Sequence, residues 1–164
     1  MSNKKEKIMA NQFKKFIIVI NALNSFKVEY ILIGGVAVIL HGLERLTRDI
    51  DIFIKMTDEN LKKLRKALFS VFDDPSIDEI TFKELDKYPV IRYGSPDDFY
   101  IDIVGRLGES NVFENLKFDV IDYQGIKIRV ATPETLYQLK KNTYRKKDEM
   151  DLLFLQDLIN KISR

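Results

Sequence analysis

Hydrophobic residues recur along the chain with two different periods. A step of three or four residues is typical of a helix packed on one face, and a step of two is typical of a strand. The first period predicts helices over residues 8–26, 36–41, 58–72, from 133 onward and about 147–162. The second period, together with short apolar runs, predicts strands over residues 28–33, 49–54, 89–93, 99–104, 117–123 and 126–130. Residues 73–87 are polar and give no clear prediction.

Signals at the ends of these segments support the predicted elements. Asp58 is a good N-cap for a helix, Thr132 followed by Pro133 suits the start of another helix, and Gln124-Gly125 suits a hairpin turn. Because no repeat or linker interrupts the pattern, we expect a single α+β domain with a mixed sheet of four to six strands flanked by helices. This domain over residues 1–164 would comprise an N-terminal helix (8–26), a core (28–130) and C-terminal helices (133–162).

Composition excludes several classes of protein. The chain has 164 residues, no Cys, one His (His41) and a formal net charge of +2. The absence of Cys excludes a disulfide scaffold and a cysteine nucleophile, and a single His excludes a zinc site with several His ligands. The small net charge gives no whole-chain argument for DNA binding. Because the longest apolar runs are far below the roughly 20 residues that cross a bilayer, we expect a cytoplasmic protein with no membrane partner.

Two acidic residues stand out on the strand predicted over residues 49–54. Asp49 and Asp51 are two residues apart, so both carboxylates lie on one face while the isoleucines between them lie on the other. Two close carboxylates repel each other, and the pair needs a proton or a cation. Without soft ligands nearby, the expected cation is Mg²⁺. The alternative is a solvated edge strand that carries two surface acids.

Glycines and cations precede these acids. Gly34-Gly35 ends a predicted buried strand and precedes a helix, where free backbone N–H groups can bind phosphate. Arg45, Thr47 and Arg48 lie between the glycines and the acids, which places two cations beside a phosphate site. Each feature has a simpler explanation: a turn with positive φ accounts for the glycines, and a basic loop that neutralises the acids accounts for the arginines.

Taken together, these residues resemble a known signature. Gly34-Gly35, nine residues, and then Arg45-x-Thr47-x-Asp49-x-Asp51 is similar to the G-[GS]-x9-R-x-T-x-D-x-D signature of a nucleotidyltransferase superfamily. The resemblance is to a minimal branch related to abortive-infection toxin nucleotidyltransferases. It implies a fold like that of DNA polymerase β, and it spans residues 31–155, with 73–98 matching least.

The resemblance also implies a third carboxylate on a neighbouring strand. Ile101-Asp102-Ile103 fits that apolar-acid-apolar context, while Asp119 and Asp122 are rival candidates. By this resemblance Asp49, Asp51 and Asp102 would be the catalytic residues and would bind one or two Mg²⁺ ions.

Two C-terminal segments extend the resemblance. Residues 133–140 are similar to the family element P-E-x-L-x-x-x-K, and residues 145–151, which begin at Arg145, are similar to R-x-K-D-x-x-D. By resemblance Lys140 would contact the nucleotide triphosphate, and Asp148 would orient the site. The alternatives are a solvated basic turn for Lys140 and an acid in the first turn of the last helix for Asp148. The implied nucleotide-binding residues are Gly34, Gly35, Arg45, Thr47, Arg48, Lys140 and Asp148.

The implied function is Mg²⁺-dependent transfer of a nucleoside monophosphate from a nucleoside triphosphate (NTP) to an acceptor hydroxyl. The acceptor would be an RNA end such as that of a tRNA, a protein side chain or a small hydroxylated molecule. The toxin relatives imply a toxin of a toxin–antitoxin pair, with an antitoxin or a second copy of the chain as partner. The alternatives are a non-catalytic nucleotide-binding or regulatory module on the same fold and, less favoured, a basic RNA-binding adaptor. For His41 we expect a structural cap, with a role at the substrate pocket as the alternative.

Overall fold

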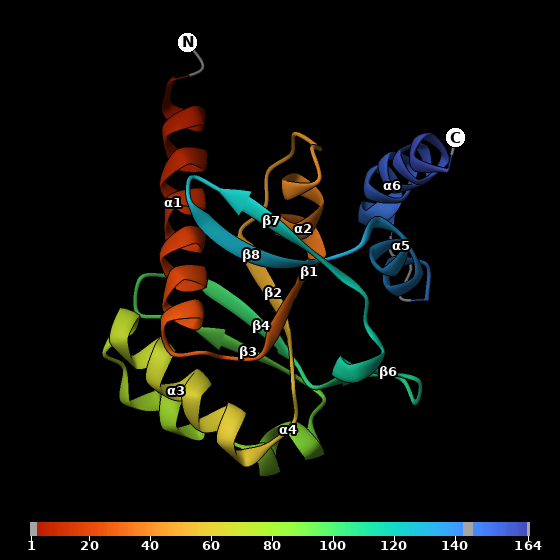
Figure 1. The fold of residues 1–164 in the computed structure, drawn as a ribbon. Coiled ribbons are helices and arrows are strands. Elements are labelled where there is room, and N and C mark those ends of the chain that lie inside the picture. Colours follow the sequence, from red (N-terminus) through yellow and green to blue (C-terminus); the bar gives the residue numbers. More distant parts are fainter. Residues whose placement is uncertain (1–2, 143–145, 164) are drawn as a thin grey trace.

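The computed structural model describes residues 3–142 and 146–163 and is built around a mixed sheet of six strands (Figure 1). The strand order across this sheet is β3-β4-β2-β1-β8-β7. The strands are β1 (Tyr30–Ile33), β2 (Asp49–Ile54), β3 (Val90–Gly94), β4 (Tyr100–Val104), β7 (Phe118–Tyr123) and β8 (Ile126–Ala131). Strands β5 (Arg106–Leu107) and β6 (Asn111–Val112) form a separate two-stranded sheet. The predicted α+β class and sheet are therefore confirmed.

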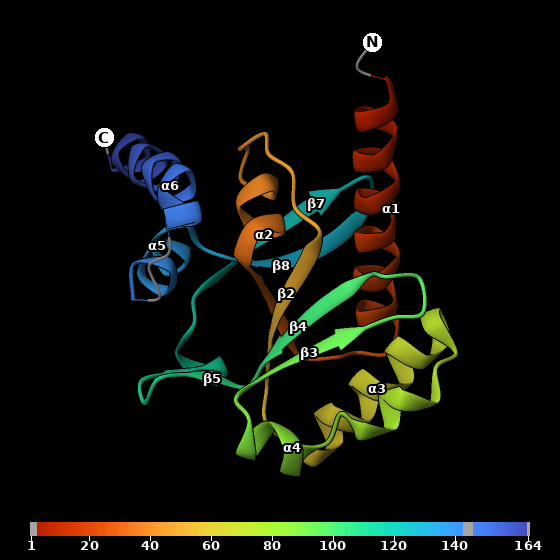
Figure 2. The same ribbon diagram turned by 180° about the vertical axis from the view of Figure 1, so that it is seen from behind.

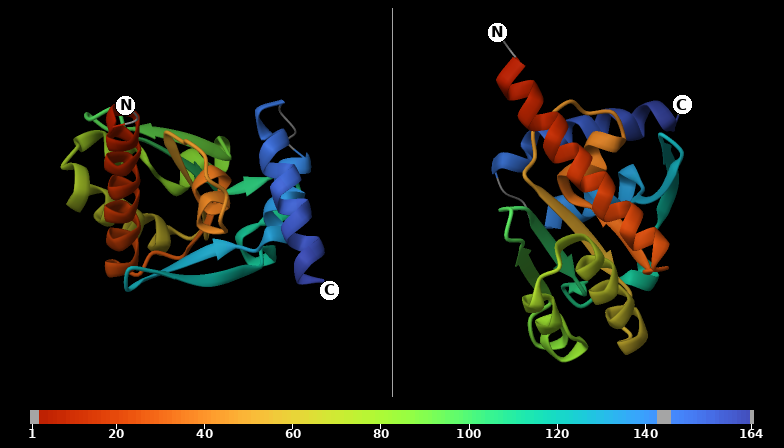
Figure 3. Two further views of the ribbon diagram at one scale, coloured as in Figure 1. Left: turned by 90° about the horizontal axis from the view of Figure 1, so that it is seen from above. Right: turned by 90° about the vertical axis from the view of Figure 1, so that its left-hand side faces the viewer.

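The helices form two groups on opposite sides of the molecule. They are α1 (Asn3–Ser25), α2 (Gly34–Leu40), α3 (Asp58–Phe72), α4 (Phe82–Lys87), α5 (Pro133–Asn142) and α6 (Glu149–Ile162). Short 3-10 turns are η1 (Pro75–Glu79), η2 (Phe113–Asn115) and η3 (Lys146–Asp148). Helices α1 and α3 pack together at one end, α5 and α6 at the other, and α2 lies between them (Figures 1 and 3).

The central strands are held by apolar side chains on both faces. All four residues of β1 are buried, and Ile50, Ile52 and Ile54 of β2 are fully buried, as the alternation in the sequence predicts. Helix α1 adds Phe16 and Ile20 to the same core. Because the acids of β2 lie opposite its isoleucines, this packing fixes the direction in which the acids project.

Strand pairing determines which acids meet. Strand β2 runs antiparallel to β1 and parallel to β4, while β3 is antiparallel to β4 and forms one edge of the sheet (Figure 2). Strands β7 and β8 form the predicted antiparallel hairpin at the other edge. The candidate site therefore lies near the β3 side of the sheet and far from β7.

Some predicted boundaries need correction. Strand β1 starts at Tyr30, two residues later than predicted, and α2 begins at Gly34 rather than Val36. The N-cap of α3 is Thr57, whose hydroxyl accepts a hydrogen bond from Asn60 N at 3.1 Å, so Asp58 is the first helical residue and not the cap. Both a Thr and an Asp can cap a helix, and here the side chain one residue earlier reaches the free N–H.

The polar stretch without a clear prediction contains η1 and α4. Asp74 caps η1 by accepting a hydrogen bond from Ser76 N, and Thr81 caps α4 by accepting one from Glu84 N. The predicted cap of α5 is confirmed, because Thr132 accepts a hydrogen bond from Thr135 N at 3.2 Å. Across the described residues, the structure contains no helix that is both long and apolar enough to span a bilayer.

Candidate active site

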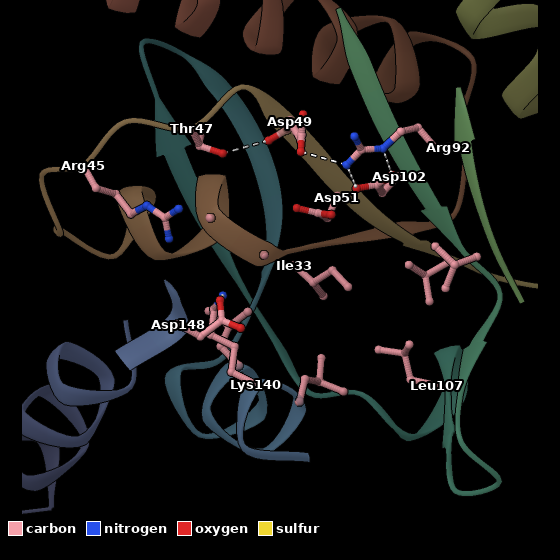
Figure 4. Close-up of a pocket in the computed structure, with 16 residues that line it drawn as sticks. Ile33, Arg45, Thr47, Asp49, Asp51, Arg92, Asp102, Leu107, Lys140 and Asp148 are labelled. Carbon is pink, nitrogen blue, oxygen red and sulfur yellow. Dashed lines mark hydrogen bonds and ion pairs between the residues drawn. The ribbon is translucent and has the colours of Figure 1, made fainter. Parts of the chain in front are cut away.

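Three aspartates lie together on one face of the sheet. The parallel register pairs Asp51 of β2 with Asp102 of β4, and Asp49 lies two residues before Asp51 on the same face of β2 (Figure 4). The rival acids Asp119 and Asp122 lie on β7 at the opposite edge, where both are exposed. Asp102 is therefore the acid that the fold brings to Asp49 and Asp51.

The surroundings of Asp51 favour its protonated form. The pKa of Asp51 is raised to about 7, first by burial of its carboxyl group and then by the Asp102 charge, a hydrogen bond with Asp102 and the Asp49 charge. The charge of Lys140 acts in the opposite direction. A carboxyl group in these surroundings retains a proton near neutral pH unless a cation takes the place of that proton.

Arg92 provides positive charge to this acidic cluster, although it is not among the residues predicted from the sequence. It lies on β3 directly opposite Asp102, and its Nε donates to Asp102 Oδ1 at 2.9 Å. Its Nη2 donates to Asp102 Oδ2 at 3.0 Å and to Asp49 Oδ2 at 2.9 Å. Hydrogen bonding to Asp102 raises the pKa of Arg92 above its usual value. The pattern of a single strand cannot reveal this contact, because it depends on the register between β3 and β4.

The donor set fits a hard divalent cation by its chemistry. Within the ranges 3–142 and 146–163, no three His, Cys, Asp or Glu side chains stand in a preformed metal-binding arrangement. The guanidinium of Arg92 instead balances Asp49 and Asp102, while Asp51 tends to hold a proton. Three carboxylates on one face, stabilised by one cation and one proton, match the oxygen ligands that Mg²⁺ prefers.

The paired glycines lie directly against these acids. Gly34 has a φ of +72°, and a Cβ built on it would lie 2.1 Å from Asp51 Oδ2. A Cβ on Gly35 would lie 3.1 Å from Thr47 Oγ1. The first turn of α2 therefore approaches Asp51 this closely only because Gly34 lacks a side chain, while Gly35 lies tightly against Thr47. This arrangement leaves backbone, rather than side chains, beside Asp51.

The segment before β2 is held by two polar contacts. Thr47 Oγ1 donates to the carbonyl oxygen of Asp49 at 3.2 Å, and Arg45 forms an ion pair with Asp151 of α6. Arg48 is exposed and does not line the cavity described below. The structure therefore brings Arg45 and Thr47 to the site but places Arg48 outside it.

The C-terminal helices contribute a buried ion network. Lys140 Nζ of α5 lies 2.9 Å from Asp151 Oδ2 and 3.3 Å from Asp148 Oδ1, and all three residues are buried. Asp151 also pairs with Arg45, so it joins two residues predicted to bind nucleotide. Asp151 belongs to the element R-x-K-D-x-x-D, but no role was predicted for it. Arg145, the first residue of that element, lies outside the described residues.

A cavity of about 370 Å³ connects these groups. Figure 4 shows the aspartates and Arg92 on the strands and Lys140 and Asp148 facing them from the C-terminal segment. The cavity is lined by every predicted site residue except Arg48, namely Gly34, Gly35, Arg45, Thr47, Asp49, Asp51, Asp102, Lys140 and Asp148. Its remaining walls are mostly apolar and include Ile33, Val90 and Leu107. The cavity thus combines charged and apolar lining residues, which suits a bound organic phosphate.

His41 lies outside the lining of this cavity. It is the C-cap residue of α2, and its Nε2 lies 2.8 Å from the carbonyl oxygen of Ala131 at the end of β8. Because a carbonyl oxygen only accepts, Nε2 carries the proton in this contact. His41 thus ties α2 to β8, in keeping with the predicted structural role.

Solved structures with the same fold include several nucleotidyltransferases. A lincomycin-bound crystal structure of the lincosamide antibiotic adenylyltransferase LnuA is 20% identical, with a TM-score of 0.56, and the match covers 87% of this chain and 95% of that chain. A putative nucleotidyltransferase from Thermotoga maritima is 19% identical, with a TM-score of 0.58 and coverage of 93% and 94%. A nucleotidyltransferase-like antigenic protein from Paracoccidioides brasiliensis is 17% identical, with a TM-score of 0.52 and coverage of 88% and 75%.

The family comparison agrees with the geometry of the site. A search of curated proteins gave no match. Residues 19–153 match the family described as nucleotidyl transferase AbiEii toxin, type IV toxin–antitoxin system. This range contains the glycines, the three aspartates and the buried ion network. Because the match covers well over half of the chain, the protein belongs to the AbiEii family and is a nucleotidyltransferase.

Proposed function

We propose that this protein transfers a nucleoside monophosphate from an NTP to an acceptor hydroxyl and that the transfer depends on Mg²⁺. The observation that carries this proposal is the register of Asp51 with Asp102 beside the Gly34-Gly35 turn, within a cavity that Lys140 also lines. Carboxylates that face phosphate-binding groups across one cavity are what phosphoryl transfer requires.

Asp49, Asp51 and Asp102 would hold the divalent cation. When bound, Mg²⁺ would neutralise charge on the triphosphate and on the departing pyrophosphate. The pKa of Asp51, which is raised to about 7 in the metal-free protein, would return toward its ordinary value because a cation favours the ionised carboxylate. The raised pKa therefore supports a role for Asp51 as a ligand that exchanges a proton for a metal ion.

The backbone and the cations would bind the triphosphate. Gly34 and Gly35 would allow the phosphates to approach the N–H groups of the first turn of α2. Arg45 and Lys140, held in place by Asp151, would add positive charge, and Thr47 would fix the segment that carries Asp49. The resemblance implies Arg48 as a further phosphate contact, and because Arg48 is exposed and outside the cavity lining, it would reach a bound triphosphate only from outside the cavity. Asp148 would position Lys140.

The reaction would proceed by direct displacement. The acceptor oxygen would form a bond to the α-phosphorus while the bond from that phosphorus to the pyrophosphate oxygen breaks. Asp102 lies at the β3 side of the acidic cluster and would take the proton from the acceptor hydroxyl. The products would be the nucleotidylated acceptor and pyrophosphate.

The acceptor would be an RNA end such as that of a tRNA, a protein side chain or a small hydroxylated molecule. The lincosamide antibiotic adenylyltransferase illustrates the small-molecule class on the same fold. The family description favours action as a toxin that is counteracted by an antitoxin, and a second copy of the chain is a further candidate partner. A non-catalytic nucleotide-binding module is the second candidate function, because Arg92 already neutralises two of the three acids.

Calorimetric titration with each of the four NTPs, with and without Mg²⁺, tests the proposal. We expect Mg²⁺-dependent binding of at least one NTP to the wild type and loss of that binding in the double variant Asp49→Asn/Asp51→Asn. Asp119→Asn is the matched control, because Asp119 is exposed on β7 and lies outside the cavity. Failure of a well-folded wild type to bind any NTP would contradict the proposal.

Turnover then separates the two candidate functions. With a labelled form of the NTP that binds, transfer to total tRNA, to the protein itself or to a panel of hydroxylated small molecules would identify an enzyme and its acceptor class. We expect the double variant to lose on the order of 10²–10³-fold in rate or more. Binding without pyrophosphate release in the presence of any acceptor class would favour the non-catalytic module.

A further inference from the structure

Arg92 forms the most extensive polar contact in the acidic cluster. Its guanidinium donates hydrogen bonds to both carboxylate oxygens of Asp102, at 2.9 and 3.0 Å, and to Asp49 Oδ2 at 2.9 Å. This fork-shaped contact is the geometry that Arg makes best with a carboxylate. The side chain is 54% exposed, so the contact is made from the rim of the cavity rather than from its interior.

The contact uses three of the four carboxylate oxygens of Asp49 and Asp102. A divalent cation held by both Asp49 and Asp102 would compete with Arg92 for these oxygens. Two positive groups cannot share the same pair of carboxylates at bonding distance without strong repulsion. Binding of a cation to both carboxylates would therefore weaken the contact with the guanidinium.

The surroundings of Arg92 on the side away from the acids are open. Arg92 lies on β3, the edge strand, and its guanidinium carbon is 5.4 Å from the centre of the Tyr100 ring. A second cavity of about 760 Å³ lies beside β3 and shares Val90 and Arg92 with the lining of the first cavity. Arg92 therefore lies at the boundary between the two cavities, and its half-exposed side chain has open space beside it on the side away from the core.

We propose that Arg92 is a built-in cation of the acidic site, which balances Asp49 and Asp102 until a divalent cation binds and is then displaced toward the second cavity. This inference rests on the proposed metal-dependent function. It makes Arg92 a positioning residue that keeps the carboxylates converging in the metal-free protein. It also makes the affinity for the metal weaker than the three carboxylates alone would give.

Titration with Mn²⁺ in the absence of nucleotide tests the inference, with free Mn²⁺ followed by electron paramagnetic resonance. The measurement is made on the chelator-treated protein at a single pH of 8 for every variant. We expect Arg92→Gln to bind Mn²⁺ at least tenfold more tightly than the wild type. Arg92→Lys keeps the charge but loses the fork, so its affinity should lie between the two. Without metal, Arg92→Gln should also melt at a lower temperature than the wild type, and Mn²⁺ should restore more of its stability.

Arg106→Gln is the matched control for the loss of one positive charge. Arg106 is exposed and lines neither cavity, so its removal should leave the affinity for Mn²⁺ unchanged. Equal or weaker Mn²⁺ binding by Arg92→Gln, with normal binding by the wild type, would overturn the role of Arg92 alone. Absence of Mn²⁺ binding in both proteins would overturn the proposed metal-dependent function as well.

Discussion

At the scale of single residues, the site contains charges that oppose folding. Asp51 is packed beneath Gly34 and beside two other acids, so the folded protein stabilises its protonated form. The same crowding places the three carboxylates on one face of the sheet, in the lining of one cavity. The arrangement that makes the site suitable for a metal therefore makes the metal-free protein less stable.

This cost predicts an unusual dependence of stability on pH. The pKa of Asp51 is about 7 in the folded protein and about 3.8 when the chain is unfolded, so the folded state holds the extra proton between these values. Stability should therefore fall as the pH rises from about 4 to about 7, by at most about 4 kcal/mol. Urea unfolding with a chelator present, at several pH values, measures this slope for the wild type and for Asp51→Asn.

The Asn variant isolates the contribution of Asp51 from that of other titrating groups. Because Asn cannot ionise, Asp51→Asn should be more stable than the wild type at pH 8 and should lose much of the slope. Asp119→Asn, exposed on β7, should follow the wild-type curve. Equal slopes for the wild type and Asp51→Asn would contradict the prediction.

Arg92 is a site residue that the pattern of the sequence alone does not predict. Alternation along the predicted strand over 89–93 shows on which face of that strand Arg92 lies. It does not show which residue lies beside Arg92, because that depends on the pairing with β4. The aspartates could be predicted because their spacing lies within one strand and one family signature. Asp102 needed the resemblance, since three separate acids were candidates for its role.

At the scale of elements, the sequence predicts best where the pattern is long and unbroken. Strand β2 was predicted to its end residues, because isoleucine and aspartate alternate from Asp49 onward. The helix over 58–72 was also predicted at its ends, although Thr57 rather than Asp58 is its cap. Helix α4 was not predicted, because six residues make less than two turns and give little periodic signal. It depends instead on its Thr81 cap and on burial of Leu85.

The junction of β1 and α2 yields a prediction about glycine. Gly34→Ala should be strongly destabilising, because its Cβ would meet the Asp51 carboxylate at 2.1 Å and φ is +72°. Gly108→Ala is the matched control, since φ is +67° there and nothing lies within 4 Å of the added Cβ. Backbone strain alone should cost roughly 1 kcal/mol in Gly108→Ala. Chemical denaturation should show a loss several kcal/mol larger for Gly34→Ala.

Nucleotide binding gives a second test of the same junction. If Gly34→Ala remains folded, the displaced Asp51 should abolish Mg²⁺-dependent NTP binding, while Gly108→Ala should bind as the wild type does. Gly35→Ala should be milder than Gly34→Ala, because its nearest contact is the Thr47 hydroxyl at 3.1 Å. Similar losses of stability in Gly34→Ala and Gly108→Ala would show that strain, rather than contact with Asp51, explains the glycine.

At the scale of the whole molecule, the site joins parts of the chain that lie far apart in the sequence. The acids belong to the central strands, whereas Lys140, Asp148 and Asp151 come from the C-terminal helical region. Asp151 connects the two regions, because it pairs both with Lys140 and with Arg45 in the segment before β2. Formation of the cavity proposed to bind nucleotide is therefore coupled to docking of α5 and α6 against the sheet.

This coupling predicts that Asp151→Ala affects both stability and binding. The change would leave Lys140 buried with less compensation, and breaking a buried ion pair in this way costs about 3–5 kcal/mol. Asp157→Asn is the matched control on the same helix, because its pair with Lys161 is exposed and its loss should cost less than about 0.5 kcal/mol. Urea unfolding measures the first effect, and calorimetry with the NTP that binds measures the second.

If Asp151→Ala loses stability but binds NTP with wild-type affinity, the network only holds the helices in place. If it also weakens binding, docking of the C-terminal helices contributes directly to the nucleotide site.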